Sequence, residues 1–576
     1  MTDQARDVTG AGGRTPAIVG GWPRVLAIST SLRVPAVLFA VTFVARVVTA
    51  LPFFAPGYPD SVYYLATARE LAAGHGFTIP YIWAFVDTGG HLPAVGLLPI
   101  PSNAHWMPLA SIVEVPFIWL LGPTYLASCL PFWLLSALGA SITYQLGIDA
   151  GLGRRTSIAA GLLMAMPGAV APYMSQPDNF SLFMVLGVTA MWLCVRGAAG
   201  NRLAFALGGV AVGLAMLART DGALLGMPFI VAFLAEQWPR WRGRSSNPVR
   251  IGWIAAIACF ALFLLVMAPW WIRDYSLFGS ISPSSSSGRI LWIRNYNDLF
   301  SVSDQTTPAT FFAQGLGPLL ASRIGGLGAA IIVLGTQPLL IVLVPFMLVG
   351  TWIRRHDPAF RPWLVYGITF LVFSALVFAV HLPYGMALHS GMALAPHAYL
   401  LSIVGIGAAV QWVAARRPHW DVPRATRNFT VIAVGLVWVI GAVSTVLLAG
   451  AWQHEADYRT ALLAQHPVPA TDRLMSADPG AYWYRWGITG VATPNDPLPV
   501  VEKAAALYDV RWLILEKDQL VPSLRPVLAG TVHPSWLSRP LAVVPASRSD
   551  TGPDAALPQA ALFAVCVSPG DARCAP

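Results

Sequence analysis

Long apolar runs separated by short polar connections fill the chain from residue 34 to residue 450. A helix needs about 20 apolar residues to cross the hydrocarbon core of a bilayer, and most of the runs come close to that length or exceed it. The runs span residues 34–52, 109–121, 124–148, 156–174, 179–196, 203–218, 222–236, 251–272, 326–352, 361–382, 392–414 and 428–450. Their length and number predict an all-α polytopic membrane protein.

Arginine is concentrated in alternate connections between these runs. By the positive-inside rule, arginine-rich connections lie in the cytoplasm and arginine-poor ones outside it. The alternation requires residues 105–148 to cross the membrane only once. The 13-residue run Leu109–Leu121 is too short to span the hydrocarbon core comfortably. We therefore expect Leu109–Leu121 to form an interfacial helix that ends at Gly122-Pro123. About eleven crossings remain, with the N-terminus inside and the C-terminus outside.

The pattern divides the chain into three parts. Residues 1–33 are expected to form a cytoplasmic tail, and residues 34–450 the transmembrane domain. The transmembrane domain carries a first external loop at 53–107 and a long external loop at 273–325. Residues 451–576 have the composition of a soluble chain and predict a small extracytoplasmic α/β domain.

Alternating and helical patterns can be assigned within this last part. The segment Leu498–Tyr508 predicts a helix. Strands are predicted at Arg473–Ala477, Arg511–Glu516, Leu541–Pro545 and Ala561–Val567.

Composition agrees with a membrane protein and argues against nucleic-acid binding. The 576 residues are 56% hydrophobic and only 11% charged, whereas a soluble domain carries about 25% charged residues. The net charge of +9 comes from arginines in short connections that form no continuous basic stripe, so we expect no nucleic-acid partner. We expect the chain to lie among membrane lipids.

The five cysteines are scattered and form neither a CxxC motif nor a Cys/His cluster. A structural zinc site therefore has no support. Cys566 and Cys574 share the predicted external domain, where a disulfide between them is one of two open alternatives.

Asp60 is the first candidate catalytic residue along the chain, in the first-loop sequence APGYPDSVYYLATARELAAGHGF. The spacing from Ser61 to Ala73 predicts a helix, and Asp60 or Ser61 is suited to cap its N-terminus. A carboxylate at the membrane surface is also placed to accept a proton from an acceptor hydroxyl. The capping and catalytic roles are compatible, and both stay open.

Three further turns on the predicted outer side are polar in apolar surroundings. They hold Asp178 and Asn179, Arg219 and Asp221, and Arg273 and Asp274. Ionisable groups at the ends of membrane helices are costly unless paired or solvated, so their recurrence predicts a shared polar cavity. Arg219 and Arg273 are the natural pair for a phosphate, because guanidinium groups match phosphate oxygens bidentately. Arg46, near the outer end of the first run, either snorkels to the interface or reaches the same phosphate.

Two histidine-containing segments face the same side. In PSNAHWMPLAS, His105 is a candidate metal ligand or phosphate binder beside Trp106, but a metal needs three or four ligands that sequence cannot assemble. His389 and Ser390 precede a spanning run, where a polar helix start is the alternative explanation. In the long external loop, Trp292, Arg294 and Tyr296 could cover a sugar or a lipid headgroup.

No P-loop, GxGxxG, GxSxG or HExxH motif occurs in a convincing context, which argues against ATP-driven transport, dinucleotide chemistry and serine hydrolysis. The ordered motifs PDSVYYLATARELAAGHGF, SNAHWMPLAS, QPDNFSLF, LARTDG, PWWIRDYSLFGSISPSSSSG, ILWIRN and LHSGMALAP cover about residues 34–415. Together they resemble the polytopic glycosyltransferases of the GT-C fold, in the bacterial branch similar to aminoarabinose transferase and protein mannosyltransferases (glycosyltransferase family 39-like). The segments ADPGAYWYRW and VRWLILE look like part of the small external domain of many relatives.

The resemblance implies transfer of a monosaccharide from a polyprenyl-phosphate donor, with inversion, to a lipid, protein or glycan outside the cytoplasmic membrane of a prokaryote. Asp60 matches the family's acidic first-loop residue and would be the general base, with Arg219 and Arg273 binding the donor phosphate. The implied substrate pocket contains Tyr63, Tyr64, His105, Trp106, Asp178, Asn179, Asp221, His389 and Ser390.

The match departs from the family at two places. Some relatives use a divalent metal near the position of His105, but no acidic residue precedes the proline of His-Trp-Met-Pro here. No metal ligand is therefore assigned beyond His105 as a candidate, and a divalent metal stays open. The family often has an acidic pair in its first loop, whereas Ser61 stands beside Asp60 and Asp87 is the only other aspartate of this loop.

Two other functions compete with sugar transfer. A transporter or lipid flippase should show charged or broken helices near the bilayer midplane, often in repeated halves. Here the ionisable residues cluster at the outer ends of the runs and no repeat is visible, which favours transfer. An inactive relative that scaffolds envelope assembly is the second alternative.

Overall fold

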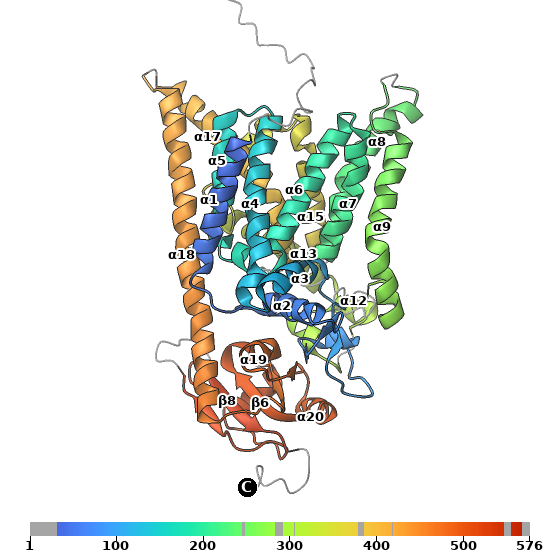
Figure 1. Ribbon diagram of the computed structural model, residues 1–576, viewed down its shortest axis with the longest axis vertical. Helices are drawn as coiled ribbons and strands as arrows, with labels where there is room; N and C mark the ends of the chain where they lie inside the picture. Colours follow the sequence, from blue (N-terminus) through green and yellow to red (C-terminus); the bar gives the residue numbers. More distant parts are fainter. Residues whose placement is uncertain are drawn as a thin grey trace, which may run out of the picture.

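The computed structural model consists of a bundle of long helices with a mixed α/β domain at one end (Figure 1). It describes residues 32–244, 248–282, 292–303, 306–377, 385–417, 419–546 and 554–566. The first loop of the chain lies between the bundle and the α/β domain and contacts both.

Within the described residues, eight helical segments are long and apolar enough to cross a membrane, and a bent pair raises the number to nine. The main helices of the eight are α1 (Arg33–Ala50), α4 (Tyr125–Asp149), α6 (Asn179–Ala198), α9 (Gly252–Phe278), α13 (Leu316–Thr336), α15 (Arg361–Leu376), α17 (Ala395–Ala414) and α18 (Val422–Gln465). The bent pair is α5 (Arg154–Ala165) followed by the short turns η2 (Gly168–Val170) and η3 (Tyr173–Ser175). The chain is thus a multi-pass membrane protein.

The remaining two of the eleven predicted crossings correspond to shorter helices in the same bundle. They are α7 (Arg202–Ala218) and η4 (Thr220–Gly226) continued by α8 (Met227–Trp241). α7 packs along α6 and α9, and α8 packs against α15 (Figure 1).

One predicted run is wrong as a single helix. Residues 326–352 are divided between α13, which ends at Thr336, and α14 (Val344–Arg354). Pro338 explains the break, because proline lacks an amide donor and disfavours helical geometry in the residue before it. Leu340 and Ile341 in the connection adopt positive φ angles of 53° and 62°.

Two short helices lie at the end of the bundle that faces the α/β domain (Figure 1). α2 (Pro59–Ala72) and α3 (Leu109–Leu121) pack together, and the Ser111 hydroxyl donates to the Tyr64 carbonyl at 2.9 Å. At about 1.5 Å per residue, α3 is only about 20 Å long. These observations agree with the interfacial helix predicted for residues 109–121.

The predicted N-cap of α2 is wrong. The helix begins at Pro59, and Tyr58 occupies the N-cap position without a side-chain capping bond. Proline is favoured at the first helical position, because its φ angle suits a helix and its missing amide leaves no donor unsatisfied. Asp60 therefore lies inside the first turn, where the helix dipole favours a negative charge.

A six-stranded sheet forms the core of the α/β domain. Its strand order is β2 (Tyr81–Ile82), β5 (Gly490–Ala492), β4 (Arg473–Ser476), β6 (Val510–Glu516), β8 (Ala560–Ala564) and β7 (Ala542–Val544). The first four strands run parallel, and β8 and β7 are antiparallel to their neighbours. The helices α19 (Pro479–Trp486) and α20 (Leu498–Leu507) connect β4, β5 and β6.

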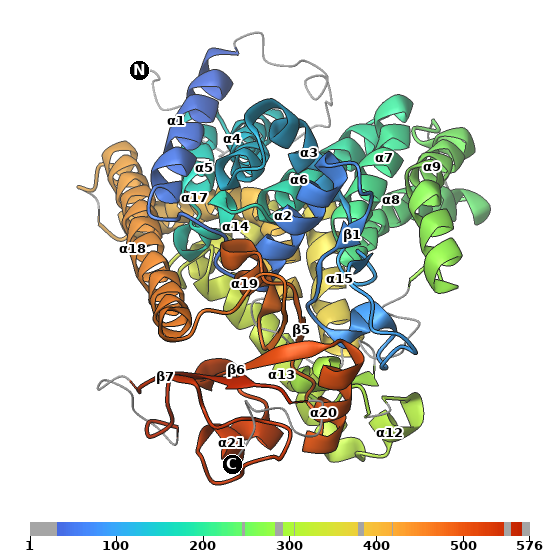
Figure 2. The same cartoon turned by 60° about the horizontal axis from the view of Figure 1, so that its bottom comes forward.

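The four strands and one helix predicted for this domain match β4, β6, β7, β8 and α20. The edge strand β2 was not predicted, and it comes from the first loop: Tyr81 pairs with Gly490, and Ile82 with Val491. Figure 2 shows α19 beside α2. The sheet thus ties the first loop to the α/β domain.

α18 joins the membrane bundle to the α/β domain without a break. Its 44 residues extend for about 66 Å at 1.5 Å per residue, so the boundary predicted after residue 450 falls inside a continuous helix. Near that boundary, the Trp452 ring packs on Phe53 and Tyr58, with centroids 4.8 and 5.5 Å away. Leu462 lies in the hydrophobic core of the domain.

The predicted disulfide can be followed on one side only. Cys566 is disulfide-bonded, and Cys574 lies outside the described residues. Their pairing stays a prediction.

Candidate active site

Three ionisable side chains from distant parts of the chain meet at the end of the bundle. Asp60 lies in the first turn of α2, Asp178 immediately before α6, and His389 at the end of α16 (Met386–His389). The Nε2 atom of His389 is 3.1 Å from Asp178 Oδ2 and 3.8 Å from Asp60 Oδ2. The sequence placed all three residues in one cavity, and the structure brings them together.

The ring of His389 is held in a fixed orientation. Its Nδ1 lies 3.0 Å from the Gly385 carbonyl oxygen, which can only accept, so Nδ1 carries a proton. The ring also stacks on Phe180 at a centroid distance of 3.8 Å. Nε2 therefore points at two carboxylates, and a shared proton or a bound cation would fit between these atoms.

Asp178 and Asp60 differ in their surroundings. The Asp178 side chain is fully buried and accepts hydrogen bonds from the Tyr58 hydroxyl at 2.7 Å and from the Asn179 amide at 2.5 Å. The Asp60 side chain retains 25% of its exposure. Burial and the Asp178 carboxylate raise the pKa of Asp60 to about 6, against the opposing charges of His389 and Arg219. Asp60 is thus the more accessible carboxylate, with a pKa suited to proton transfer near neutral pH.

A second polar cluster adjoins the first. Arg219 follows α7, and its Nε donates to Asp221 Oδ1 at 3.1 Å and to Ser390 Oγ at 2.9 Å. The Ser390 hydroxyl in turn donates to Asp221 Oδ2 at 2.5 Å. Ser390 is the neighbour of His389, so the Arg219–Asp221–Ser390 cluster places a guanidinium group beside the two carboxylates. Two of the three polar turns predicted to share a cavity, those of Asp178 and of Arg219, thus lie together, and the cavity itself stays a prediction.

Tyrosines and an asparagine connect α2 to these clusters. The Asn179 side-chain amide donates to the Tyr64 hydroxyl at 2.9 Å and lies 3.5 Å from the Ala218 carbonyl oxygen. The Tyr63 hydroxyl accepts from the Asn103 amide at 2.6 Å. The α2 residues that follow Asp60 are therefore fixed on the first loop and on α6.

Aromatic rings of the first loop form a continuous wall. Trp106 lies 4.4 Å from Tyr63 and 4.0 Å from Trp83, and Trp83 stacks on His105 at 5.6 Å. Burial, with a smaller contribution from Arg219, lowers the pKa of His105 to about 4. His105 is thus part of an aromatic wall, and the group of potential metal ligands found among the described residues does not include it.

Arg273 and Arg46 have contacts other than those predicted. Arg273 of α9 pairs with Asp274 at 2.9 Å, donates to the Ser102 carbonyl at 2.7 Å and lies over the Trp270 ring. These contacts attach α9 to the first loop, and among the described interactions none joins Arg273 to Arg219 or Asp60. Its role in phosphate binding stays a prediction.

Arg46 neither snorkels nor remains available for a phosphate. It is fully buried and donates to the carbonyls of Ala165 at 2.5 Å and Ala171 at 2.6 Å. Ala165 is the last residue of α5, and a helix end leaves carbonyl oxygens unsatisfied. Arg46 thus stabilises the bend between α5 and η2.

The side chains of Asp60, Asp178 and His389 could hold a divalent cation. One ligand atom from each lies within 4.8 Å of the other two. Two carboxylates and one imidazole suit Mn²⁺ or Zn²⁺, and such an ion would offset the charge of the two carboxylates. Asp87, the other first-loop aspartate, is buried in η1 (Phe85–Thr88) outside this group, and burial raises its pKa to about 7.

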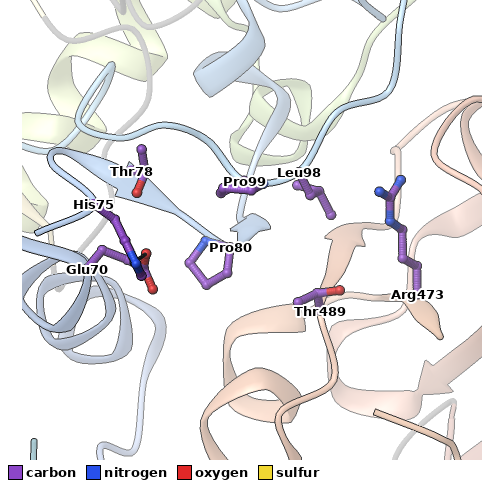
Figure 3. A pocket seen from close by; sticks show the side chains of 8 residues that line it. All are labelled: Glu70, His75, Thr78, Pro80, Leu98, Pro99, Arg473 and Thr489. Atoms are coloured by element: carbon purple, nitrogen blue, oxygen red, sulfur yellow. Dashed lines mark hydrogen bonds and ion pairs between the residues drawn. The ribbon is translucent and has the colours of Figure 1, made fainter. Parts of the chain in front are cut away.

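A separate cleft of about 600 Å³ lies between the first loop and the α/β domain (Figure 3). The Glu70–His75 pair lines one side, and Arg473 and Thr489 line the other. None of the predicted site residues lines it. Glu70 is ten residues after Asp60 on α2, about 15 Å away at 1.5 Å per residue.

Three residues that contribute to the site were missed from sequence. Tyr58 holds Asp178, Phe180 stacks on His389, and Trp83 anchors the aromatic wall. Tyr58 and Phe180 stand within two residues of Asp60 and Asp178, so proximity was the available signal. Trp83 carried no local signal.

The fold defines a class, the polytopic membrane proteins with the GT-C fold. No protein-family model and no curated protein matches the chain. Among solved structures, the chain is similar to ArnT from Cupriavidus metallidurans in the apo state, with a TM-score of 0.52 and 14% identity over 93% of this chain and 97% of that one. For the same protein bound to undecaprenyl phosphate, the TM-score is 0.50 and the identity 15%, over 92% of this chain and 97% of that one. For the Archaeoglobus fulgidus oligosaccharyltransferase in the apo form, the TM-score is 0.52 and the identity 12%, over 84% of this chain and 69% of that one. At these identities the similarity concerns the fold.

Proposed function

We propose that the protein is an integral membrane glycosyltransferase that moves a monosaccharide from a polyprenyl-phosphate donor to an acceptor hydroxyl. The observation that carries this proposal is the meeting of a partly exposed carboxylate, Asp60, with Arg219 and the Asp178–His389 pair at one end of the bundle. The GT-C fold adds support, because one solved structure of similar fold has undecaprenyl phosphate bound.

In this proposal Asp60 is the general base of an inverting displacement. Its carboxylate takes the proton of the acceptor hydroxyl while the hydroxyl oxygen attacks C1 of the sugar. The bond between C1 and the phosphate oxygen breaks, and its electron pair leaves with the polyprenyl phosphate. A pKa of about 6 leaves most Asp60 deprotonated at neutral pH while keeping it basic enough to accept the proton.

Positive charge then stabilises the departing phosphate. Arg219 is bound through Nε to Asp221 and Ser390, and its two remaining nitrogens carry further donors for phosphate oxygens. A divalent cation on Asp60, Asp178 and His389 would add charge at the same place. Arg273 is proposed as a second phosphate-binding residue from the sequence resemblance alone.

The proposal includes an orientation and a domain organisation. The α/β domain and α2, the helix that carries Asp60, lie at the same end of the bundle (Figure 1), and by the distribution of arginine this end is external. Residues 1–33 would then be a cytoplasmic tail, residues 34–450 the transmembrane domain in the cytoplasmic membrane, and residues 451–576 the extracytoplasmic domain. The acceptor would be a lipid, protein or glycan.

The direct test uses the full-length protein in proteoliposomes with a panel of radiolabelled polyprenyl-phosphate pentoses and hexoses, and native membranes as the acceptor source. We expect one donor to lose its label to the acceptor fraction, with release of polyprenyl phosphate and an inverted anomeric centre in the product. A flippase would move the donor across the bilayer without cleaving it. Absence of transfer from every donor, with the fold intact, would reject the proposal.

A further inference from the structure

The α/β domain holds a segment of the long external loop through one side chain. Asp496 lies in the turn between β5 and α20 and is 5% exposed. Its carboxylate accepts from the Ser301 hydroxyl at 2.7 Å and from the amides of Val302 at 2.7 Å and Ser303 at 3.1 Å, as well as from the Ser303 hydroxyl. The Asn495 amide also donates to the Phe300 carbonyl at 3.2 Å. These bonds cross from one part of the chain to another almost 200 residues away.

The segment held in this way directly follows η5 (Tyr296–Phe300), a short helix with its own N-terminal capping box. The side chain of Asn295 donates to Asp298 at 2.8 Å, and the Arg294 amide donates to the same carboxylate at 2.9 Å. η5 is therefore fixed locally at its start and by the α/β domain at its end.

Two aromatic rings of η5 extend the wall beside the candidate active site. Phe300 lies 5.7 Å from Trp83 in an edge-to-face arrangement, and Tyr296 lies 5.5 Å from Phe300. Burial, with a smaller contribution from the Asp60 charge, raises the pKa of Tyr296 to about 12. Tyr296 therefore stays a neutral hydrogen-bond donor at physiological pH.

We propose that Asp496 is a positioning residue, which holds η5 so that Tyr296 and Phe300 continue the Trp83–Trp106 wall as a sugar-binding surface. Aromatic rings present large rigid faces, and the tyrosine hydroxyl adds a hydrogen bond. The inference assigns the α/β domain a role: it sets the geometry of the donor sugar without contributing a reacting group. It rests on the proposed function, because it names the sugar of the donor as the ligand of the wall.

The test begins with Asp496→Asn in the full-length protein. An asparagine nitrogen cannot accept from the loop amides, so at least one charge-assisted hydrogen bond is lost, and we expect kcat/KM for the donor to fall about ten-fold. Asp472→Asn is the matched control, since Asp472 accepts from Trp512 at 2.8 Å within the same domain. We expect the control to retain wild-type transfer. A wild-type rate in Asp496→Asn would overturn the proposal.

A double-variant comparison separates positioning from a general loss of stability. In a Tyr296→Ala background the wall is already incomplete. Adding Asp496→Asn to this background should therefore lower kcat/KM for the donor by less than about two-fold. A full ten-fold loss in that background would show that Asp496 does not act through η5. Should Asp496→Asn fail to fold, Ser301→Ala with Ser303→Ala removes donors from the loop side and leaves the domain unchanged.

One readout does not depend on transfer. Hydrogen exchange of residues 292–303 should be faster in Asp496→Asn than in the wild type, with the bundle helices unchanged. If the wild type transfers no sugar, the proposed function fails, and this exchange still decides whether Asp496 fixes the loop. Unchanged exchange in these residues would contradict the positioning role.

Discussion

A buried cluster of charges and hydroxyls fastens α18 to the sheet, and its removal should loosen the α/β domain. Glu516 at the end of β6 is 1% exposed and accepts from Arg459 at 2.8 and 3.0 Å, from Tyr458 at 3.0 Å and from Tyr482 at 2.5 Å. Asp478 lies 3.5 Å from the same guanidinium group. Breaking a buried ion pair on one side typically costs about 3–5 kcal/mol, because the remaining charge loses its partner.

For Glu516→Gln we expect a loss near the lower limit of that range, about 3 kcal/mol. Glutamine keeps one acceptor for the tyrosines, and Asp478 still compensates part of the Arg459 charge. The assay is hydrogen exchange of β6 and β8 in the full-length protein, where 3 kcal/mol corresponds to an opening equilibrium over 100-fold larger. Glu455→Gln is the control, because Glu455 is 37% exposed and 3.8 Å from Arg459, and such a pair contributes at most about 1 kcal/mol.

The effect should depend on pH in one direction. Burial alone would raise the pKa of Glu516, but Arg459 and the two tyrosine hydroxyls lower it below the usual 4.5. A lowered folded-state pKa means that the stabilisation is present above about pH 4.5 and is lost as the pH falls through the folded-state value. The difference between wild type and Glu516→Gln should therefore shrink in acid. Equal exchange in the two proteins at pH 7, or an equal loss in Glu455→Gln, would refute this reasoning.

Three further predictions concern the candidate active site. The transfer rate should rise with pH through about 6 as Asp60 loses its proton. Asp178→Asn should move this rise to lower pH, because it removes a charge that raises the Asp60 pKa. An unmoved pH profile would argue against coupling between the two carboxylates. In a pH-rate series with and without EDTA, added Mn²⁺ should also move the rise to lower pH in the wild type but not in His389→Gln. An equal response of both proteins would exclude Asp60, Asp178 and His389 as the cation site. Arg219→Lys should raise KM for the donor about ten-fold or more, since lysine cannot replace a guanidinium group that binds Asp221, Ser390 and a phosphate together; an unchanged KM would remove Arg219 from the phosphate site.

The membrane crossings and the site cluster could be predicted from sequence because both follow from short-range patterns. Apolar runs mark the spanning helices, and the arginine alternation assigns their ends to two sides. Asp60, Asp178 and His389 stand next to helix ends on the same predicted side, so their meeting needed only that these ends lie close together. The break after α13 also had a local signal in Pro338, which the long apolar run outweighed.

Other features depend on contacts that a linear pattern does not contain. The edge strand β2 has only two residues and pairs with a strand about 400 residues away. The sequence position of Arg46 suggested a membrane surface, but its guanidinium group binds buried carbonyls at the bend after α5. Arg273 likewise binds a first-loop carbonyl whose position only the fold reveals. In each case the deciding partner is far away in the sequence.

The most direct test of the central claim is the transfer rate of Asp60→Asn compared with Glu70→Gln on the same helix. Both variants remove one carboxylate charge from α2, but Glu70 pairs with the exposed His75. We predict that Asp60→Asn lowers the transfer rate by about 10²–10⁴-fold, as expected for loss of a general base, while it still inserts into membranes. Glu70→Gln should transfer at the wild-type rate. Transfer by Asp60→Asn within a few-fold of the wild type would contradict the assignment of Asp60 as the base.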